Sequence, residues 1–304
     1  MDGFDIIGDI HGHANALERL LEDLDYNQRD GVYRHPSRIA VFAGDFVDRG
    51  PEQMAVLRIA RDMVEAGCAR AVMGNHEFNA IAWATPDGEG RHLRPHTPKN
   101  QKQHRNFLEQ MGDGSEAHAD TIAWFRTLPL WLDFGDLRVV HACWHSPSQQ
   151  ALANWLDADA RLSDIGIHAA HDRADPAFLA VEVLLKGPEV RLPSGRSFRD
   201  KDGHLRDEAR LRWWDPTAVT FRKAALGMEG LESDLPDEPV PMDFFYTDTV
   251  PVLFGHYWMK GEPAILQPFA SCLDFSVASD GYLTAYRWSG ESKLKAHNLV
   301  WVSA

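Results

Sequence analysis

The sequence predicts an α/β fold that carries a cap-like insertion, and three observations support this prediction. Short runs of β-branched and apolar residues alternate with amphipathic helical patterns, which is typical of α/β architecture. Five of the strand-like runs end in Asp, Asn or His, as expected where a sheet binds a ligand at the carboxyl ends of its strands. Residues 146–248 lack this rhythm, and the strand pattern resumes after them.

The first part of the chain predicts three strands separated by two helices. The run 4–10 is expected to be a strand, and leucines at helical spacing predict a helix over 14–24. A second strand is expected over 38–43. A helix over 51–67 follows, opened by a proline at its first position and closed by a glycine. The run 69–73 is the third strand.

The same alternation returns later in the chain. Residues 121–128 predict a short helix, and the runs 137–140 and 250–254 predict strands. The tail over 264–288 reads as successive strands, with a turn over 279–281.

The stretch between these strands is expected to be an insertion. Residues 151–162 and 176–185 show helical patches, and 196–206 predicts a hairpin that turns at its Asp-Gly pair. Since the strand pattern resumes afterwards, we expect residues 1–304 to form a single domain, with 146–248 as a cap-like insertion within it.

The composition argues against several classes of protein. A formal net charge of −14 disfavours binding of long nucleic acids, because neutralising their phosphates requires a basic face. No apolar stretch approaches the ~20 residues that cross a bilayer, and no basic leader precedes the first strand, so we expect a cytoplasmic protein. Three cysteines are too few for a disulfide framework, and we expect Cys143 and Cys272 to be buried. Nothing indicates a partner protein.

Polar residues at the strand ends predict a metal site. Carboxylate, amide oxygen and imidazole ligands are those that hard and borderline divalent cations prefer. Two metals about 3.5–4 Å apart need a shared ligand, and a carboxylate such as Asp45 can reach both. The residues concerned are Asp9, His11, Asp45, Asn75, His141 and His256.

Three sequence blocks resemble the calcineurin-like metallophosphoesterases. They are GDIHG at 8–12, GDFVDRG at 44–50 and GNHE at 74–77. More narrowly, they are similar to the phosphoprotein phosphatase branch, which includes bacterial Ser/Thr phosphatases and symmetrical dinucleoside tetraphosphate hydrolases. The resemblance covers residues 4–145 and 250–288, and it implies a two-layer core of mixed β-sheet flanked by helices.

This resemblance also implies roles for the polar residues. Two divalent ions would be bound, with Mn²⁺ as the first choice and Fe or Zn²⁺ as alternatives, and a hydroxide that bridges them would be the nucleophile. Asp9 and His11 would hold the first ion, Asp45 both, and Asn75, His141 and His256 the second.

Three further residues of the same blocks receive roles from the resemblance. His76 would be the general acid that protonates the leaving oxygen, and Asp48 would orient it. Arg49 would clamp phosphate oxygens, a task that suits the planar fork of its guanidinium.

Residues outside the blocks leave alternatives open. His145 either lines the site or belongs to an ordinary loop. Arg212 and Trp214 either contact the substrate or belong to a packed tryptophan pair. Residues 90–108 carry Lys, Arg and His but no Asp or Glu, and they form either a solvated loop or a basic flap beside the catalytic face.

Three functions remain at this stage. The first is a Ser/Thr-phosphatase-like phosphomonoesterase, and the second is a hydrolase of dinucleoside polyphosphates or other nucleotides. The third is a catalytically silent phospho-binding module, which is disfavoured because every expected ligand is present. The substrate would be a phosphorylated small molecule, a nucleotide or a phosphoprotein.

Overall fold

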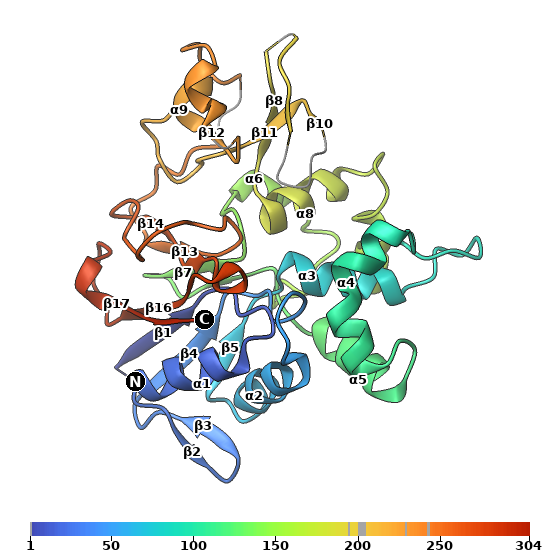
Figure 1. Ribbon diagram of the computed structural model, residues 1–304, viewed down its shortest axis with the longest axis vertical. Helices are drawn as coiled ribbons and strands as arrows, with labels where there is room; N and C mark the ends of the chain where they lie inside the picture. The colour runs from blue at the N-terminus through green and yellow to red at the C-terminus, as the bar shows by residue number, and fades with distance from the viewer. Residues whose placement is uncertain (1, 194, 200–204, 229, 242–243) are drawn as a thin grey trace.

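The protein forms two packed β-sheets with helices around them (Figure 1). The computed structural model describes residues 2–193, 195–199, 205–228, 230–241 and 244–304. The predicted α/β fold, with a two-layer core of mixed sheet flanked by helices, is confirmed.

The first sheet contains the N-terminal strand at its centre. β1 pairs in parallel with β4 and antiparallel with β16, so the sheet is mixed. Its order is β15-β16-β1-β4-β5, and β17 also pairs with β16. The strands are β1 (Gly3–Ile7), β4 (Arg38–Phe42), β5 (Ala69–Ala71), β15 (Asp274–Phe275), β16 (Tyr282–Trp288) and β17 (Leu299–Ser303).

The second sheet has four strands in the order β14-β13-β7-β6. β13 pairs in parallel with both of its neighbours, whereas β6 and β7 are antiparallel. The strands are β6 (Trp131–Asp133), β7 (Arg138–Val140), β13 (Val252–Phe254) and β14 (Ala270–Cys272).

The two sheets face each other through alternate residues of their strands. Ile6 and Val41 point to a buried cluster that they share with Val139 and Leu253 of the second sheet. The intervening residues of β1 and β4 point to the opposite face, where they join the large cluster that contains Leu17 of the first helix. The period of two that characterises a strand therefore explains why these runs are apolar at nearly every position.

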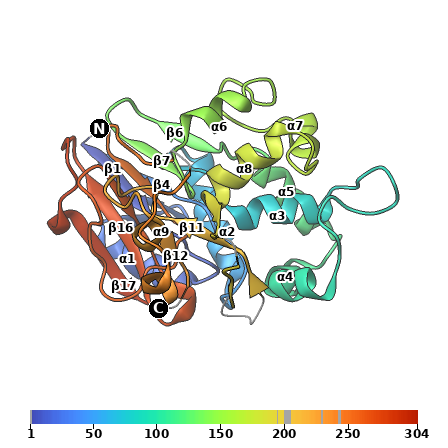
Figure 2. The same ribbon diagram turned by 90° about the horizontal axis from the view of Figure 1, so that it is seen from above.

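Helices cover the outer faces of the sheets (Figures 1 and 2). The α-helices are α1 (Ala14–Asp23), α2 (Gln53–Glu65), α3 (Asn75–Ala84), α4 (Pro98–Met111), α5 (Glu116–Phe125), α6 (Ser146–Ala151), α7 (Asp164–Ala169), α8 (Pro176–Lys186) and α9 (Phe221–Ala224). Short 3₁₀ turns are η1 (Leu231–Asp234), η2 (Val277–Ser279) and η3 (Ala296–Asn298).

Two predicted helices begin elsewhere than expected. Pro51 lies outside α2. Glu52 donates its backbone N–H to the carbonyl of Gly12, and the helix begins at the next residue, Gln53. The helix expected over 121–128 begins at Glu116, because the Ser115 side chain caps it by accepting a hydrogen bond from the amide of His118.

The predicted helical patch over 151–162 is wrong. α6 ends at Ala151, and the chain then turns. The Asp157 carboxylate accepts hydrogen bonds from the amides of Asp159 and Arg161. Such local bonds from a short polar side chain compete with the helix, and they hold Ala160 at a φ of 61°.

The segment between the two halves of the second sheet divides into two parts. Residues 146–186 contribute α6, α7 and α8, and Leu152, Ile167 and Leu184 of this part join the large cluster that contains Leu17. Residues 189–240 have an apolar cluster of their own. Its strands are β8 (Glu189–Arg191), β11 (Glu208–Leu211) and β12 (Ala225–Leu226), which stand with α9 at the top of Figure 1.

The predicted hairpin is present as a strand pair. β9 (Phe198–Arg199) pairs antiparallel with β10 (Leu205–Arg206), whereas the expected turn at 202–203 lies outside the described residues. A further hairpin, β2 (Asn27–Arg29) with β3 (Val32–Arg34), and strands β6 and β17 were not predicted.

Two other expectations can be compared with the structure. Cys143 and Cys272 are fully buried, as predicted. Among the described residues no helix combines the length and the apolar character needed to cross a membrane.

Candidate active site

The polar residues predicted from the strand ends meet in one place. Each follows a strand of the two-sheet core directly or within a few residues, and the structure brings all six together. Their exposed fractions do not exceed 8%. They are Asp9, His11, Asp45, Asn75, His141 and His256.

Asp45 lies at the centre of this cluster. Its Oδ2 is 3.7 Å from Nε2 of His11, 3.5 Å from Nε2 of His141 and 3.9 Å from Nε2 of His76. On the other side, Oδ2 of Asp9 accepts a hydrogen bond of 3.0 Å from the backbone amide of His256. One carboxylate therefore faces imidazoles from three different elements.

Backbone carbonyls set the tautomers of two of these imidazoles. Nδ1 of His11 donates to the carbonyl of Val47 at 3.0 Å, and Nδ1 of His141 donates to that of Ala43 at 2.8 Å. In the neutral ring, Nε2 then presents a lone pair to the cluster. Nε2 of His141 lies 3.1 Å from Oδ1 of Asn75, so two acceptor atoms face each other whenever the His141 ring is neutral.

Several buried atoms of the cluster lack a hydrogen-bond partner within the described part of the chain. They are Oδ1 of Asp9, Nε2 of His11 and Nε2 of His256. A buried acceptor atom without a partner lowers the stability of the fold. A cation bound between such acceptors would remove this cost. Two sets of donor atoms lie within 4.8 Å of one another, with Asp45 common to both: His11, Asp45 and His76, and Asp45, His141 and His256.

The electrostatics agree with a site for cations. Burial lowers the pKa of His11 to about 4 and holds that of His256 well below its usual range, so both rings are neutral and present a lone pair. Burial opposes the charge of His141, but the Asp45 carboxylate outweighs it and raises the pKa of His141 to about 10. Positive charge beside Asp45 is therefore favoured.

The backbone around the cluster is held in unusual conformations. His11, Asp45 and His256 have φ values of 47°, 52° and 74°, a region that non-glycine residues rarely occupy. Glu77 supports the turn at Asp45. Its buried carboxylate accepts hydrogen bonds from the amides of Asp45, Phe46 and Gly74 at 2.8, 2.9 and 3.0 Å.

Position 74 requires glycine, because the chain there passes very close to Asp45. A Cβ atom at this position would lie 2.2 Å from Oδ1 of Asp45 and 2.3 Å from its backbone nitrogen, so any side chain would displace the central carboxylate. Burial raises the pKa of the neighbouring Glu77 to about 7.

His76 and Asp48 form a hydrogen-bonded pair at the edge of the cluster. Nδ1 of His76 donates to Oδ2 of Asp48 at 2.5 Å, which leaves Nε2 directed to the side where Asp45 lies. Burial opposes ionisation of Asp48, but His104 and His76 outweigh it and hold the pKa of that carboxyl below its usual range. The pair can therefore present a proton beside the donor cluster.

Arg49 and two of the less specific candidates lie around this centre. Arg49 is exposed, and its guanidinium lies 5.1 Å from the ring centre of Trp258. His145 caps α6, where its Nδ1 lies 2.8 Å from Oγ of Ser148, and its ring contacts Phe244.

Arg212 and Trp214 are not part of the donor cluster. Arg212 is exposed. Trp214 is buried and packs against Phe254 and Tyr257, whose ring in turn lies edge-on to His256.

Sequence reasoning missed four residues near the site. Glu77 was quoted in a sequence block but received no role, although a Glu at the third position of a helix is a known capping signal. His104 and Arg94 were counted only as charges of the basic segment, although Nδ1 of His104 lies 2.8 Å from Oδ1 of Asp48. Burial lowers the pKa of Arg94, and the nearby Asp48 carboxylate opposes this. Arg210 was not singled out. Arg210 lowers the pKa of His256 after burial, the larger cause.

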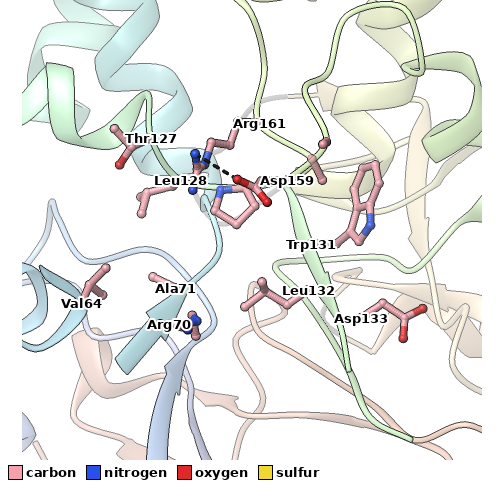
Figure 3. A pocket seen from close by; sticks show the side chains of 13 residues that line it. Val64, Arg70, Ala71, Thr127, Leu128, Trp131, Leu132, Asp133, Asp159 and Arg161 are labelled. Atoms are coloured by element: carbon pink, nitrogen blue, oxygen red, sulfur yellow. Dashed lines mark ion pairs between the residues drawn. The ribbon is translucent and has the colours of Figure 1, made fainter. Parts of the chain in front are cut away.

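A cavity of about 610 Å³ lies elsewhere on the molecule (Figure 3). It is lined by β5, β6 and the turn over 158–161, including Arg70, Trp131 and the ion pair of Arg161 with Asp159. None of the six cluster residues lines it. The side-chain chemistry, and not the presence of this cavity, therefore locates the candidate site.

The chain is similar to known proteins. A family model described as calcineurin-like phosphoesterase matches residues 4–190. An asymmetrical bis(5′-nucleosyl)-tetraphosphatase of Halalkalibacterium halodurans is 45% identical over 74 residues, which are 24% of this chain and only 30% of that relative. A symmetrical bis(5′-nucleosyl)-tetraphosphatase of Methylococcus capsulatus is 27% identical over 296 residues, 93% of this chain and 91% of that relative.

A solved structure supports the same fold. It is described only provisionally as a diadenosine tetraphosphatase, and it aligns with a TM-score of 0.50 and 20% identity over 99% of this chain and 92% of its own.

Proposed function

Because the chain belongs to the calcineurin-like phosphoesterase family and is therefore a phosphoesterase, we propose that it hydrolyses phosphate monoesters with the help of divalent metal ions. The observation that carries this proposal is the hydrogen-bonded His76–Asp48 pair beside the donor cluster. A monoester of an aliphatic alcohol releases a poor leaving group, and a positioned acid is what such a leaving group requires.

The donor cluster fits two divalent ions that share Asp45. Asp9 and His11 would hold one ion, and Asn75, His141 and His256 the other. Oxygen and imidazole donors without a thiolate suit Mn²⁺, Fe or Zn²⁺, and we propose Mn²⁺ as the first choice. When bound, the ions would neutralise phosphate charge and activate water for attack on phosphorus.

The chain's own side chains would do the remaining work. The Nδ1–H of His76 is held by Asp48, so Nε2 is the atom that gives a proton to the leaving oxygen. Arg49 is exposed beside the cluster and would bind phosphate oxygens. Arg210 of β11 would add positive charge from the region over 189–240.

A second candidate is the hydrolysis of dinucleoside polyphosphates. The relative from Methylococcus capsulatus, which is similar over 93% of this chain, carries a name that states this activity. In such a substrate the leaving group is a phosphate of low basicity, so the reaction would depend less on His76 than monoester hydrolysis does.

A substrate panel with added Mn²⁺ tests both candidates. It consists of a phosphoserine peptide, p-nitrophenyl phosphate, bis-p-nitrophenyl phosphate and diadenosine tetraphosphate, with phosphate or nucleotide release as the measurement. We expect kcat/KM to be highest for a monoester. Cleavage of the tetraphosphate without monoester hydrolysis would establish the second candidate and exclude the first.

A further inference from the structure

The Asp48 carboxylate accepts hydrogen bonds from two imidazoles. Its Oδ2 accepts from Nδ1 of His76 at 2.5 Å, and its Oδ1 accepts from Nδ1 of His104 at 2.8 Å. We propose that His104 is a positioning residue of the hydrolytic site, which fixes the Asp48 carboxylate so that Asp48 in turn fixes His76. This inference rests on the proposed role of His76 in hydrolysis.

His104 lies on the buried face of helix α4, which places its imidazole beside Asp48. The helix is capped by Thr97, whose side chain accepts from the amide of Asn100, and it opens with Pro98. Its buried residues are His104, Phe107, Leu108 and Met111, which recur at helical spacing and face the core. The imidazole of His104 is 1% exposed and lies against the ring of Phe107 at 4.7 Å. Figures 1 and 2 show α4 beside α3, the helix that carries His76.

The same helix also holds the backbone that carries Asp48. Asp48 and Arg49 have φ values of 68° and 72°, and such conformations persist only where surrounding bonds impose them. Nδ2 of Asn106 donates to the carbonyl of Arg49 at 2.7 Å and to that of Gly50 at 3.2 Å. Helix α4 therefore constrains both the main chain and the carboxylate of Asp48.

Both carboxylate oxygens of Asp48 are thus fixed, and this has a mechanical consequence. A carboxylate with one partner can rotate about its Cβ–Cγ bond, and the His76 ring can then move with it. The hydrogen bond from His104 removes this freedom, because rotation would break a buried bond to a charged group. Nε2 of His76 is then held in one direction, the geometry that efficient proton transfer requires.

A packing role alone does not explain the imidazole. Nε2 of His104 is buried and forms no hydrogen bond within the part of the chain that the structure describes, and an apolar side chain would avoid that cost. His118 of α5 provides an internal comparison. It is 3% exposed and near Phe107, and its Nε2 is likewise buried without a partner among the described residues. Its Nδ1, however, accepts from the amide of Gly114 and makes no contact with the site, so the bond to Asp48 is what distinguishes His104.

Two substitutions of His104 separate positioning from packing. In His104→Asn the side-chain amide can occupy the place of Nδ1 and donate to Asp48, whereas in His104→Gln it reaches the place of Nε2. We expect His104→Gln to lower kcat for a phosphoserine peptide by about 10–100-fold, a part of the ~10²–10⁴-fold that proton transfer contributes. The loss for p-nitrophenyl phosphate should be distinctly smaller, KM should stay near the wild-type value, and His104→Asn should restore most of kcat.

The matched control is His118→Gln, with Mn²⁺ content measured for every variant. It should change kcat for both substrates equally or not at all. Equal loss on both substrates in His104→Gln, or no difference between His104→Asn and His104→Gln, would overturn the inference and leave His104 a packing residue.

A second readout does not depend on which substrate is cleaved. In protein with ¹⁵N-labelled histidine and bound Zn²⁺, the ring signals of His76 should shift in His104→Gln and not in His118→Gln. Unchanged His76 signals would overturn the inference. A wild-type protein that cleaves no phosphate ester with any added metal would instead refute the proposed function, so the two failures are distinguishable.

Discussion

At the scale of single residues, the site depends on backbone turns that its neighbours hold in place. The strand-like runs and their polar ends predicted which residues would meet, because ligands bind at the carboxyl ends of strands in α/β sheets. They did not reveal that Glu77 accepts three amide hydrogen bonds around Asp45. That contact depends on the turn at Asp45, whose φ of 52° is not readable from residue types.

Glu77→Gln tests this support. The amide keeps the volume but replaces an acceptor oxygen with a donor that faces backbone N–H groups. An unsatisfied buried group costs about 1–3 kcal/mol, so we expect the free energy of unfolding in urea to fall by about that amount. Glu65→Gln, at a side chain that is 57% exposed, is the control and should change it by less than about 0.5 kcal/mol. Equal effects of the two substitutions would show that the hydrogen bonds of Glu77 do not stabilise the turn at Asp45.

His76→Asn tests the assignment of the acid. Proton donation matters in proportion to the basicity of the leaving group, and it contributes ~10²–10⁴-fold. We expect kcat for a phosphoserine peptide to fall by about that factor, and kcat for p-nitrophenyl phosphate to fall distinctly less. Asp48→Asn should have the same pattern in milder form. If His76→Asn slowed both substrates equally, or removed the metal, His76 would be a ligand and not the acid.

At the scale of elements, helix α4 departs most from expectation. The basic segment 90–108 was left open between a solvated loop and a flap, but residues 98–111 form a helix. Its charges mask an amphipathic pattern in which His104 belongs to the buried face and Lys99, Lys102 and Arg105 to the exposed one. A histidine reads as polar in sequence, and only its long-range contact with Asp48 shows why it is buried.

The exposed face of α4 can be tested by charge reversal. If its cations attract the substrate, the triple change of Lys99, Lys102 and Arg105 to Glu should raise KM for multiply charged substrates by several-fold, and for p-nitrophenyl phosphate by less. The effect should shrink as salt rises, since exposed charges are screened over ~10 Å at 0.1 M. Unchanged KM values across the panel would show that these side chains face solvent and do not attract the substrate.

At the scale of the whole molecule, the two-sheet architecture was easier to predict from the sequence than strand β17 and the region between the halves of the second sheet. Most strands of the two-sheet core were predicted because buried strands read as continuous apolar runs, but β6 was not. Strand β17 was not, although it pairs with β16 over five residue pairs. The region over 189–240 was equally difficult, because its small apolar cluster is assembled from short strands whose pairing depends on tertiary context.

We propose that Arg210 of that region, which also pairs with Glu189 at 3.8 Å, supplies positive charge to the site, and a comparison of two arginines tests this. We expect Arg210→Ala to raise KM for a phosphorylated substrate by about 10–100-fold, since a hydrogen bond to a charged group contributes about 1.5–3 kcal/mol and ~1.4 kcal/mol corresponds to a factor of ten. Arg212→Ala, two residues away and exposed, should raise KM less. A larger effect at Arg212 would show that the sequence had identified the substrate contact correctly and that Arg210 acts only on His256.

The central claim is that hydrolysis depends on metal held by the buried donor cluster. The most direct test measures phosphate release after exhaustive chelation, together with elemental analysis of the protein before and after. We expect bound divalent metal in the active protein, loss of activity with its removal and recovery on addition of Mn²⁺. Asp45→Asn should bind metal weakly and stay inactive at ordinary metal concentrations, because the shared ligand is impaired. Full activity in excess chelator, with no metal in the protein, would contradict the account.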